Sequence, residues 1–432
     1  MPGSGLQLPL LGLGPSQCED ECVHDWYRFV LGFPPSLVRD YLQRFDLPPG
    51  TLVLDPFAGT GTTPVECKKS AVCAVGIEAN PMAHFAGRVK LDWSPDPVGL
   101  LRHAEHLAQQ VLDELPDEAP SAPNALRSLP REAASLLITD SISPWPLHKT
   151  LVLLDVLERN RDDRYQSHEL LALARVLPTG IGNLRFGPEV GLGQRKPDSP
   201  VVGLWLEQVR RMAADLEAVQ GRGSAEAVVR LGDSRRAMDF LEPESIDAVI
   251  TSPPYPNEKD YTRTVRLESV LLGFIRSKSD LRAVKRGLLR SNTRNVYKTD
   301  CDDDYIRDLP VIQEIADAIE ARRLELGKNS GFERMYHRVT KLYFGGMARH
   351  FADLRPALKP GAQLAYVVGD QASYLRVMIR TGQLLAEIAE SLGYEVLGID
   401  LFRTRMATAT REQLREEVHG ATRVPEAHDG LG

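Results

Sequence analysis

Cysteine is scarce in this chain, with five residues among 432. So few thiols exclude a disulfide-stapled scaffold and are typical of a protein that works in a reducing cytoplasm. No apolar run reaches the roughly 18 residues of a membrane span. The apolar opening at residues 6–13 is broken by proline and glycine and follows no basic residue. We therefore expect no signal peptide, no membrane partner and a location in the bacterial cytoplasm.

An excess of positive charge is also missing. Lysine and arginine total 52 against 59 acidic residues, which gives a formal net charge of −7. Binding to nucleic acid would therefore need a local basic face. With 432 residues and 43% hydrophobic side chains, the chain can bury a large core in two or three domains, or in one domain with insertions.

Signatures of polyphosphate binding are absent as well. A glycine-rich turn at residues 59–61 is followed by Thr62-Thr63-Pro64, without the lysine of a G-x-x-x-x-G-K-[ST] loop. Pro64 also stands where the dinucleotide pattern G-x-G-x-x-G needs its third glycine. The turn therefore favours a nucleoside-type ligand that carries no polyphosphate.

What the chain does contain is an alternation of strand and helix patterns. Apolar runs at 51–54 and 72–77 flank a helical stretch at 63–70, which predicts a parallel strand–helix–strand unit. Helical spacing dominates residues 95–222, and strand patterns follow at 227–231, 246–250, 363–368 and 394–402. Further helical stretches are expected at 37–45, 264–276, 304–357 and 376–392.

This pattern predicts an α/β fold with a doubly wound, mostly parallel sheet and a large helical insertion. We expect the sheet domain to cover residues 21–95 and 225–405. The insertion would cover 96–224, either as a target-recognition region or as a buttress for the sheet. The polar residues 406–432 are expected to form a flexible tail.

A glycine-rich turn joins the first predicted strand to its helix, with the sequence Asp55-Pro56-Phe57-Ala58-Gly59-Thr60-Gly61-Thr62-Thr63. Glycines let a backbone approach a ligand closely, and the helix behind them offers unpaired N–H groups. Glu78 ends the next strand and Asn80 follows it. Ligands of open α/β sheets bind at the carboxyl ends of strands, where an acid can accept hydrogen bonds from a ribose diol. These residues predict a cofactor site; a glycine turn that serves packing alone is the alternative.

A second motif, Ser252-Pro253-Pro254-Tyr255, follows the strand pattern at 246–250. Two prolines fix two φ angles, so this corner is rigid. The exocyclic amine of a nucleobase is a poor nucleophile, because its lone pair is conjugated with the ring. Acceptors at Ser252 Oγ and the Pro253 carbonyl would hold its two hydrogens and favour a pyramidal nitrogen, while Tyr255 offers a face for stacking. No strong general base is needed, since the proton leaves after the nitrogen has become cationic. The alternative is an ordinary proline turn.

Taken together, these residues resemble the S-adenosylmethionine-dependent DNA amino-methyltransferases, which make N4-methylcytosine or N6-methyladenine. Residues 55–63 resemble the cofactor loop of that family, and Glu78 matches its ribose-binding acid. Ser252 to Tyr255 matches the catalytic tetrapeptide. Two further segments resemble the part that covers the methionine end and the element beside the adenine, namely Phe33-Pro34-Pro35-Ser36-Leu37-Val38 and Asp233-Ser234.

The resemblance implies a Rossmann-like methyltransferase fold and S-adenosylmethionine as the cofactor. It implies catalytic roles for Ser252, Pro253, Pro254 and Tyr255. Cofactor contacts are implied for Phe33, Pro34, Asp55, Pro56, Phe57, Gly59, Gly61, Thr62, Thr63, Glu78, Asn80, Asp233 and Ser234. A serine in the first catalytic position is more usual among the cytosine-N4 enzymes of the family, so cytosine N4 is the expected target.

A basic run at 276–298 contains a single acid, Asp280, and lies soon after the tetrapeptide. An enzyme that flips a base needs a grip on phosphates near its pocket. We therefore expect nucleic-acid contacts from Lys259, Arg263, Arg266, Lys285, Arg286, Arg290 and Arg294. A solvated helix face is the alternative. Cys18, Cys22 and His24 have no second ligand pair at useful spacing, so no metal site is predicted.

The sequence thus predicts a site-specific DNA methyltransferase of bacterial modification or defence, with DNA and a companion restriction or defence nuclease as partners. Three alternatives stay open, namely an adenine-N6 DNA methyltransferase, an RNA amino-methyltransferase and a catalytically silent nucleic-acid-binding subunit. A protein-amide methyltransferase is a further one, and it would not need the basic run.

Overall fold

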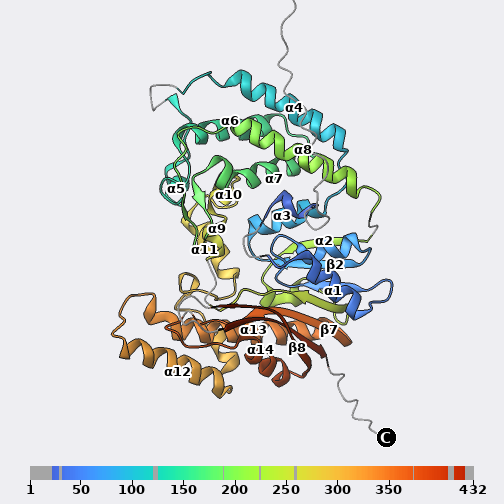
Figure 1. The fold of residues 1–432 in the computed structure, drawn as a ribbon, viewed down its shortest axis with the longest axis vertical. Helices are drawn as coiled ribbons and strands as arrows, with labels where there is room; N and C mark the ends of the chain where they lie inside the picture. Colours follow the sequence, from blue (N-terminus) through green and yellow to red (C-terminus); the bar gives the residue numbers. More distant parts are fainter. Residues whose placement is uncertain are drawn as a thin grey trace, which may run out of the picture.

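A seven-stranded sheet forms the lower part of the molecule, and a layer of helices stands above it (Figure 1). The computed structural model describes residues 22–28, 32–119, 125–187, 189–222, 225–256, 260–372, 374–406 and 413–423. The sheet has the order β5-β2-β1-β6-β7-β9-β8. Its strands are β1 (Leu52–Asp55), β2 (Cys73–Glu78), β5 (Ala227–Leu231), β6 (Ile246–Thr251), β7 (Leu358–Gly369), β8 (Tyr394–Met406) and β9 (Gln413–Arg423).

The strand directions make this a doubly wound sheet. Strands β5, β2, β1, β6 and β7 pair in parallel, whereas β9 runs antiparallel to both β7 and β8. The chain moves outward from β1 through β2 to β5 and then returns to β6 on the other side of β1. The reversal lies between β1 and β6, and open α/β sheets bind ligands at such a point. The predicted doubly wound, mostly parallel fold is confirmed.

Successive side chains of a buried strand point to opposite faces of the sheet, and helices cover both faces. In β1, Val53 packs in a cluster with α1, whereas Leu54 packs in a cluster with α13 and α14. Parallel strands with both faces buried are near-continuous apolar runs, which is how β1 and β6 appear in the sequence. The helices of the sheet region are α1 (Pro35–Phe45), α2 (Thr62–Lys69), α3 (Pro81–Leu91), α9 (Tyr261–Thr264), α10 (Arg266–Leu271), α11 (Lys278–Gly287), α12 (Pro310–Glu325), α13 (Tyr336–Leu354) and α14 (Thr381–Ser391).

The helical stretch at 95–222 lies within the crossover from β2 to β5 and forms the upper layer of Figure 1. It contains α4 (Pro97–Glu114), α5 (Arg131–Ala134), α6 (Pro144–Arg159), α7 (Gln166–Val176), α8 (Val201–Val219) and the hairpin β3 (Leu184–Arg185) and β4 (Gly191–Leu192). One apolar cluster joins Leu100 and Trp205 of this layer to Val65 of α2 and Phe85 of α3. The layer therefore buttresses the sheet through α2 and α3.

The expected flexible tail at 406–432 is wrong for part of its length. Residues 413–423 form β9, an inner strand between β7 and β8. The segment contains several charged residues and therefore reads as polar in the sequence. In the structure its described charges are paired, which allows the segment to be an inner strand. Arg415 pairs with Asp370 (3.3 Å) and Glu417 (3.0 Å), and the carboxylate of Glu417 lies 3.3 Å from His419. Among the described side chains of β9, Val418 is the one large apolar residue of a strand pattern. Residues 424–432 lie outside the described residues.

The remaining differences from the sequence prediction concern helix ends. The stretch at 304–357 is not one helix but contains α12, α13 and the short turns η6 (Asp302–Ile306), η7 (Glu333–Met335) and η8 (Arg355–Ala357). Pro310 begins α12, and Gly327 follows its end with a φ of +62°. Other short turns are η1 (His24–Trp26), η3 (Leu177–Ile181), η4 (Ser234–Asp239) and η5 (Thr293–Asn295). Among the described residues, no helix is both long enough and apolar enough to cross a membrane.

Candidate active site

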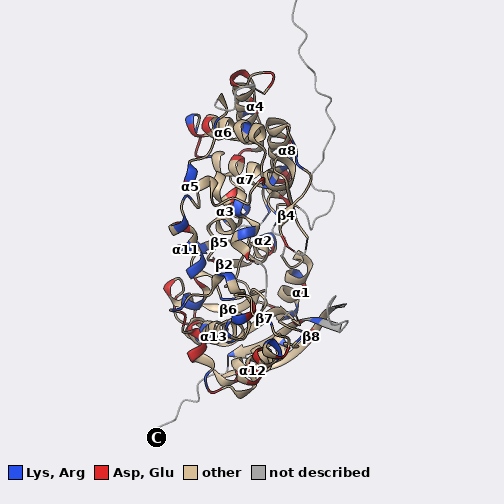
Figure 2. Cartoon of the chain, turned by 90° about the vertical axis from the view of Figure 1, so that its left-hand side faces the viewer, with Lys and Arg blue, Asp and Glu red and all other residues tan. Residues whose placement is uncertain are grey.

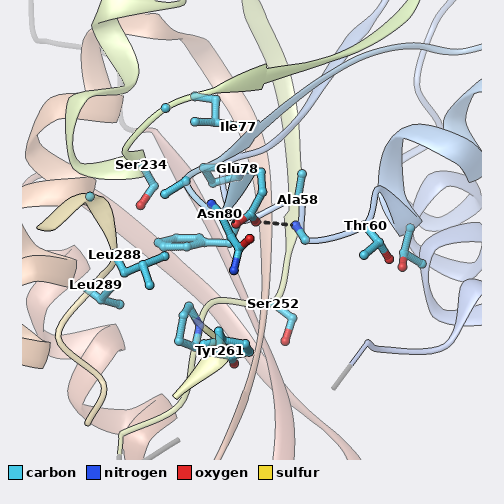
Figure 3. Close-up of a pocket in the computed structure, with 18 of the residues that line it drawn as sticks. Ala58, Thr60, Ile77, Glu78, Asn80, Ser234, Ser252, Tyr261, Leu288 and Leu289 are labelled. Atoms are coloured by element: carbon cyan, nitrogen blue, oxygen red, sulfur yellow. Dashed lines mark hydrogen bonds between the residues drawn. The ribbon is translucent and has the colours of Figure 1, made fainter. Parts of the chain in front are cut away.

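A cavity of about 850 Å³ opens at the point where the strand order reverses. Its walls come from the ends of β1, β2 and β6, and from the segment after α11 (Figure 3). The lining residues are Gly32, Phe33, Pro56, Phe57, Ala58, Gly59, Thr60, Thr62, Ile77, Glu78, Ala79, Asn80, Gly232, Ser234, Ser252, Pro254, Tyr261, Gly287, Leu288 and Leu289.

The glycine turn after β1 forms one wall of this cavity. Gly59 and Gly61 have φ values of +53° and +87°, which favour glycine because it lacks a Cβ. A Cβ on Gly61 would lie 3.2 Å from the Cα of Gly87, so the turn also needs glycine to let α3 approach. Helix α2 begins at Thr62 without a side-chain cap. Its first N–H groups therefore stay available near the cavity.

Glu78 lies in the middle of the cavity, where β2 ends (Figure 3). Its two carboxylate oxygens accept the N–H of Gly59 at 2.8 Å and the N–H of Asn80 at 2.7 Å. These two bonds fix the carboxyl group and leave each oxygen a further lone pair. Burial raises the pKa of Glu78 to about 7. The group is thus a held acceptor for a pair of hydroxyls.

Asp55 ties β1 to β6 rather than lining the cavity. Its Oδ1 accepts the Thr251 hydroxyl at 2.6 Å and the N–H of Phe57 at 3.1 Å. Its Oδ2 is buried and has no hydrogen-bond partner among the described residues. Burial raises the pKa of Asp55 to about 6. Thr63 acts in the same way, because its hydroxyl donates to the carbonyl of Ile250 at 3.0 Å. These two predicted residues tie the end of β1 and the first turn of α2 to β6.

The far end of the cavity is apolar, with Ile77, Leu288 and Leu289 beside Ser234. Sequence analysis missed the two leucines. They form an apolar pair within the basic run, and this break in the run is the sequence feature that indicates a buried position.

Asp233 was predicted at the same end, but it is not among the lining residues. It binds the Arg235 guanidinium at 2.6 Å, and Arg235 also binds Asp302 at 2.6 Å. Asp233 therefore positions Ser234 through a buried ion pair.

The predicted tetrapeptide borders the cavity at the end of β6. Ser252 and Pro254 line it, and the Ser252 hydroxyl donates to the carbonyl of Val367 on β7 at 3.0 Å. Pro253 is buried, and Tyr255 is half-buried against the core beneath the sheet. Tyr261 of α9 also lines this region.

Phe33 and Pro34 precede α1, which begins at Pro35. Phe33 lines the cavity, and both residues line a second, adjoining cavity of about 1340 Å³. Thr60 and Thr62 of the glycine turn line both cavities, so this segment lies beside that turn.

Three of the predicted nucleic-acid residues have internal partners. Lys285 pairs with Asp260 at 2.9 Å, and Arg290 pairs with Asp300 at 2.8 Å and is 4% exposed. Arg266 donates to the carbonyl of Thr262 at 2.8 Å and to that of Leu136 at 3.3 Å. These side chains join the segments after the tetrapeptide to one another and to the insertion.

The other predicted basic residues have more open positions. Arg286 and Arg294 are exposed, and their guanidinium groups lie over the rings of Tyr297 and Phe332. Arg263 is half-buried, and its Nε has no hydrogen-bond partner among the described residues. Lys259 lies outside the described residues.

No trio of His, Cys, Asp or Glu within the described ranges is arranged to hold a metal ion. His24 instead lies 2.8 Å from Glu66, and Cys18 is outside the described residues.

Comparison with known proteins connects this geometry to a family. A family model described as "DNA methylase" matches residues 24–85, from η1 through the glycine turn to α3. The chain is 26% identical to the Type II methyltransferase M.BsoBI of Geobacillus stearothermophilus, over 91% of this chain and 83% of that protein. It is 24% identical to the Type II methyltransferase M.AvaI of a Nostoc species, over 91% of this chain and 85% of that protein.

These matches support a DNA amino-methyltransferase of the N4/N6 type. A crystal structure of TrmN from Thermus thermophilus is also similar, with 12% identity and a TM-score of 0.28. The match covers 94% of this chain and 53% of that one, so the methyltransferase spans about half the length of TrmN. At this score the likeness adds nothing to the fold, which the strand order establishes.

The methyltransferase uses S-adenosylmethionine, which supplies an electrophilic methyl group. The cavity fits this cofactor. Glu78 offers two fixed acceptors to a ribose diol, and Ile77, Leu288 and Leu289 form an apolar slot for a flat purine. A Cβ on Gly59 would meet no atom within 4 Å, so this cavity-lining residue faces open space where a ligand can approach the backbone.

His350 supports the cavity wall at Ser234. Its Nδ1–H donates to the Ser234 carbonyl at 2.8 Å, so its Nε2 accepts the hydroxyl of Tyr366 at 2.6 Å. Its ring also packs edge-on against Phe57, 5.0 Å between ring centroids. Burial lowers the pKa of His350 to about 4. The folded protein therefore holds this imidazole neutral.

This burial predicts a pH-dependent contribution to stability. The pKa of His350 is lower in the folded than in the unfolded state, so its contribution is present above pH 6.5 and is lost as the pH falls towards 4. We expect His350→Gln to be less stable than the wild type at pH 7, and the difference to shrink by about 2 kcal/mol at pH 5. Urea unfolding of both proteins at the two pH values measures it. An unchanged difference would contradict a neutral buried imidazole.

Proposed function

We propose that the protein methylates the exocyclic amino group of a base flipped out of DNA, with cytosine N4 as the target. The observation that carries the proposal is that Ser252 and Pro254 line the same cavity as Glu78 and the glycine turn. An amine held at the tetrapeptide would therefore lie beside the methyl donor. Such alignment of reacting groups is worth many powers of ten in rate.

The hydrogen bond of Ser252 supports its role as an acceptor. Its hydroxyl hydrogen is directed to the carbonyl of Val367, so the lone pairs of Oγ remain for the hydrogens of a bound amine. The Pro253 carbonyl would accept the second hydrogen. Two prolines keep these acceptors rigid, which holds the nitrogen lone pair in one direction. Tyr255 would stack on the base.

The cavity also supports a reaction without a strong general base. Among its described lining residues, Glu78 and Tyr261 are the ionisable ones. Glu78 is already held by the N–H groups of Gly59 and Asn80, at the position proposed for the ribose. The amine would therefore lose its proton to solvent after methylation, which its cationic product allows.

The choice of cytosine N4 rests on Ser252, because serine at this position is more usual among the cytosine-N4 enzymes that the chain resembles. The test is methyl transfer from labelled S-adenosylmethionine to unmethylated genomic DNA, followed by mass spectrometry of the nucleosides. We expect N4-methylcytosine. N6-methyladenine would overturn the choice of base, and incorporation into RNA but not DNA would overturn the substrate.

We further propose that α11 grips DNA phosphates. Lys278, Arg282 and Arg286 are exposed on this helix, and Figure 2 shows α11 blue over much of its length, next to α5. Leu281 and Val284 bind the opposite face of α11 to α5 and α10, so the basic face is presented rigidly. Arg286 lies one residue before the cavity-lining Gly287, so phosphate contacts there would lie close to the flipped base. Lys285, Arg290 and Arg266 are left out of this proposal because of their internal partners.

The helical insertion is our candidate for target recognition. Its α5 packs against α11, which puts the insertion beside the basic face. The hairpin β3–β4 on the same insertion presents an exposed Arg185. A companion nuclease and a cytoplasmic location, where the chromosome lies, complete the proposed role in DNA modification.

A further inference from the structure

Lys90 is a buried lysine that has no anionic partner among the described residues. It lies near the end of α3, is 2% exposed and donates one hydrogen bond, to the Thr60 hydroxyl at 3.3 Å. No carboxylate of the described residues lies within ion-pair distance of its ammonium. Burying an ammonium is costly unless an anion or several hydrogen bonds compensate it. This makes Lys90 unlike buried arginines such as Arg235 and Arg290, which are paired with aspartates.

The fold brings Lys90 to the glycine turn. A Cβ on Gly61 would lie 3.2 Å from the Cα of Gly87, so α3 packs closely against the turn. Lys90 follows Gly87 by three residues, about one helical turn, so it extends from the contact point towards Thr60. Lys90 lines the second cavity, and Thr60 lines both cavities. The ammonium therefore lies where the two cavities meet.

The charges around the second cavity favour an anion. Arg28, Lys90 and Arg175 line it, together with Asp25 and Glu268. Asp25 is already paired with Arg28 at 2.5 Å. Burial raises the pKa of Glu268 to about 7, and its carboxyl group accepts the hydroxyl of Tyr27. Burial lowers the pKa of Lys90 to about 7, so a bound anion would stabilise the charged form of its amine.

The position of Thr60 indicates which kind of anion would bind beside Lys90. In Figure 3, Thr60 lies on the opposite side of Glu78 from Ser234, Leu288 and Leu289. A donor with its purine against the leucines and its ribose on Glu78 would direct its amino-acid chain towards Thr60. The α-carboxylate is the outer end of that chain. A DNA phosphate would need a surface cation, whereas Lys90 is 2% exposed.

We propose that Lys90, with the Thr60 hydroxyl, binds the α-carboxylate of the methyl donor and of its product S-adenosylhomocysteine. The inference rests on S-adenosylmethionine as the cofactor. Lys90 is thereby a positioning residue, because it anchors the end of the chain that carries the sulfur.

Calorimetric titration of the full-length protein with two nucleosides tests the proposal. S-adenosylhomocysteine has the carboxylate, and 5′-methylthioadenosine lacks the whole amino-acid end. Lys90→Met should weaken binding of S-adenosylhomocysteine by about 10- to 100-fold. It should change binding of 5′-methylthioadenosine by less than about twofold, because the nucleoside contacts are untouched. Equal effects on both ligands, or none on S-adenosylhomocysteine, would overturn the proposal.

Lys68→Met is the matched control. The Lys68 ammonium is also partly buried, donates to the carbonyl of Leu91 at 2.6 Å and lies over the Trp93 ring, but it lines neither cavity. We expect its substitution to leave both affinities unchanged. A loss of S-adenosylhomocysteine binding in this variant equal to that in Lys90→Met would count against a local role for Lys90.

A measurement on the wild type covers the case in which Lys90→Met does not fold. The carboxamide of S-adenosylhomocysteine keeps the shape and loses the charge, so it should bind at least about tenfold more weakly than the acid. Equal binding of acid and amide overturns the role of Lys90 and leaves the cofactor assignment intact. If the wild type binds neither S-adenosylhomocysteine nor 5′-methylthioadenosine, the cofactor assignment itself fails.

Discussion

Ser252→Ala should lower the rate constant of methyl transfer by about 10²- to 10³-fold, the loss typical of removing one preorganised polar group from a reacting centre. The variant keeps the backbone and the two prolines but loses the acceptor that holds the target amine. Because Ser252 touches the amine rather than the ribose, the affinity for S-adenosylhomocysteine should change less than about threefold. Single-turnover incorporation of labelled methyl into unmethylated DNA measures the first quantity, and calorimetry the second.

Ser245→Ala provides a control at the other end of the same strand. Ser245 precedes β6, Ser252 follows it, and each hydroxyl donates to a backbone carbonyl. Loss of the Ser245 hydroxyl should leave the rate of methyl transfer unchanged. A Ser252→Ala variant that retains a third of the wild-type rate would refute the proposed acceptor role. Parallel loss of S-adenosylhomocysteine binding would instead assign Ser252 to the cofactor.

Neutralising Lys278, Arg282 and Arg286 to glutamine should weaken binding to a random-sequence DNA duplex by about two to three powers of ten at 0.1 M salt. Each lost phosphate contact removes about 0.9 from the slope of log affinity against log salt concentration, so the slope should become shallower by about 2.7. The affinities of variant and wild type should converge near 1 M salt. A fluorescence anisotropy titration at several salt concentrations measures both effects, and a random sequence suffices because phosphate contacts are independent of base identity.

A triple variant near α12 supplies the same change in net charge. Arg307 and Lys328 are exposed there and Arg322 is partly exposed; they pair with Asp304, Glu333 and Glu325. Their replacement by glutamine should leave the salt slope unchanged. If both triple variants lose affinity equally, the effect belongs to net charge and the basic face of α11 has no special role.

The sheet could be predicted because its strands are short apolar runs that end in polar residues. The strands that end at Asp55 and Glu78 have both faces buried, so each is a nearly continuous apolar run. Such a run can be identified as a strand from its own residues alone. The same holds for the glycine turn, whose positive φ angles restrict the residue type at Gly59 and Gly61. Local physical constraints therefore placed most of the cofactor cavity.

The rest could not be predicted because it depends on residues far apart in the sequence. Strand β9 contains the half-buried Arg415 and the buried Glu417, whose places in an inner strand depend on Asp370 and His419 beside them. The sequence predicts a DNA contact for Arg290, but in the structure Arg290 is paired with Asp300. Leu288 lines the cavity because α11 ends there, which its sequence neighbours do not indicate. No sequence spacing indicates that Lys90 reaches Thr60.

The placement of β9 between β7 and β8 also bears on how the protein is made. The ribosome produces β7 and β8 before residues 413–423, yet these two strands pair with β9 and not with each other. Both therefore keep an open edge during synthesis until the later segment arrives. Open edges of nascent strands recruit other chains. A stretch that is polar in sequence, with charges that find their partners only in the finished sheet, is well suited to close such a gap without itself aggregating beforehand.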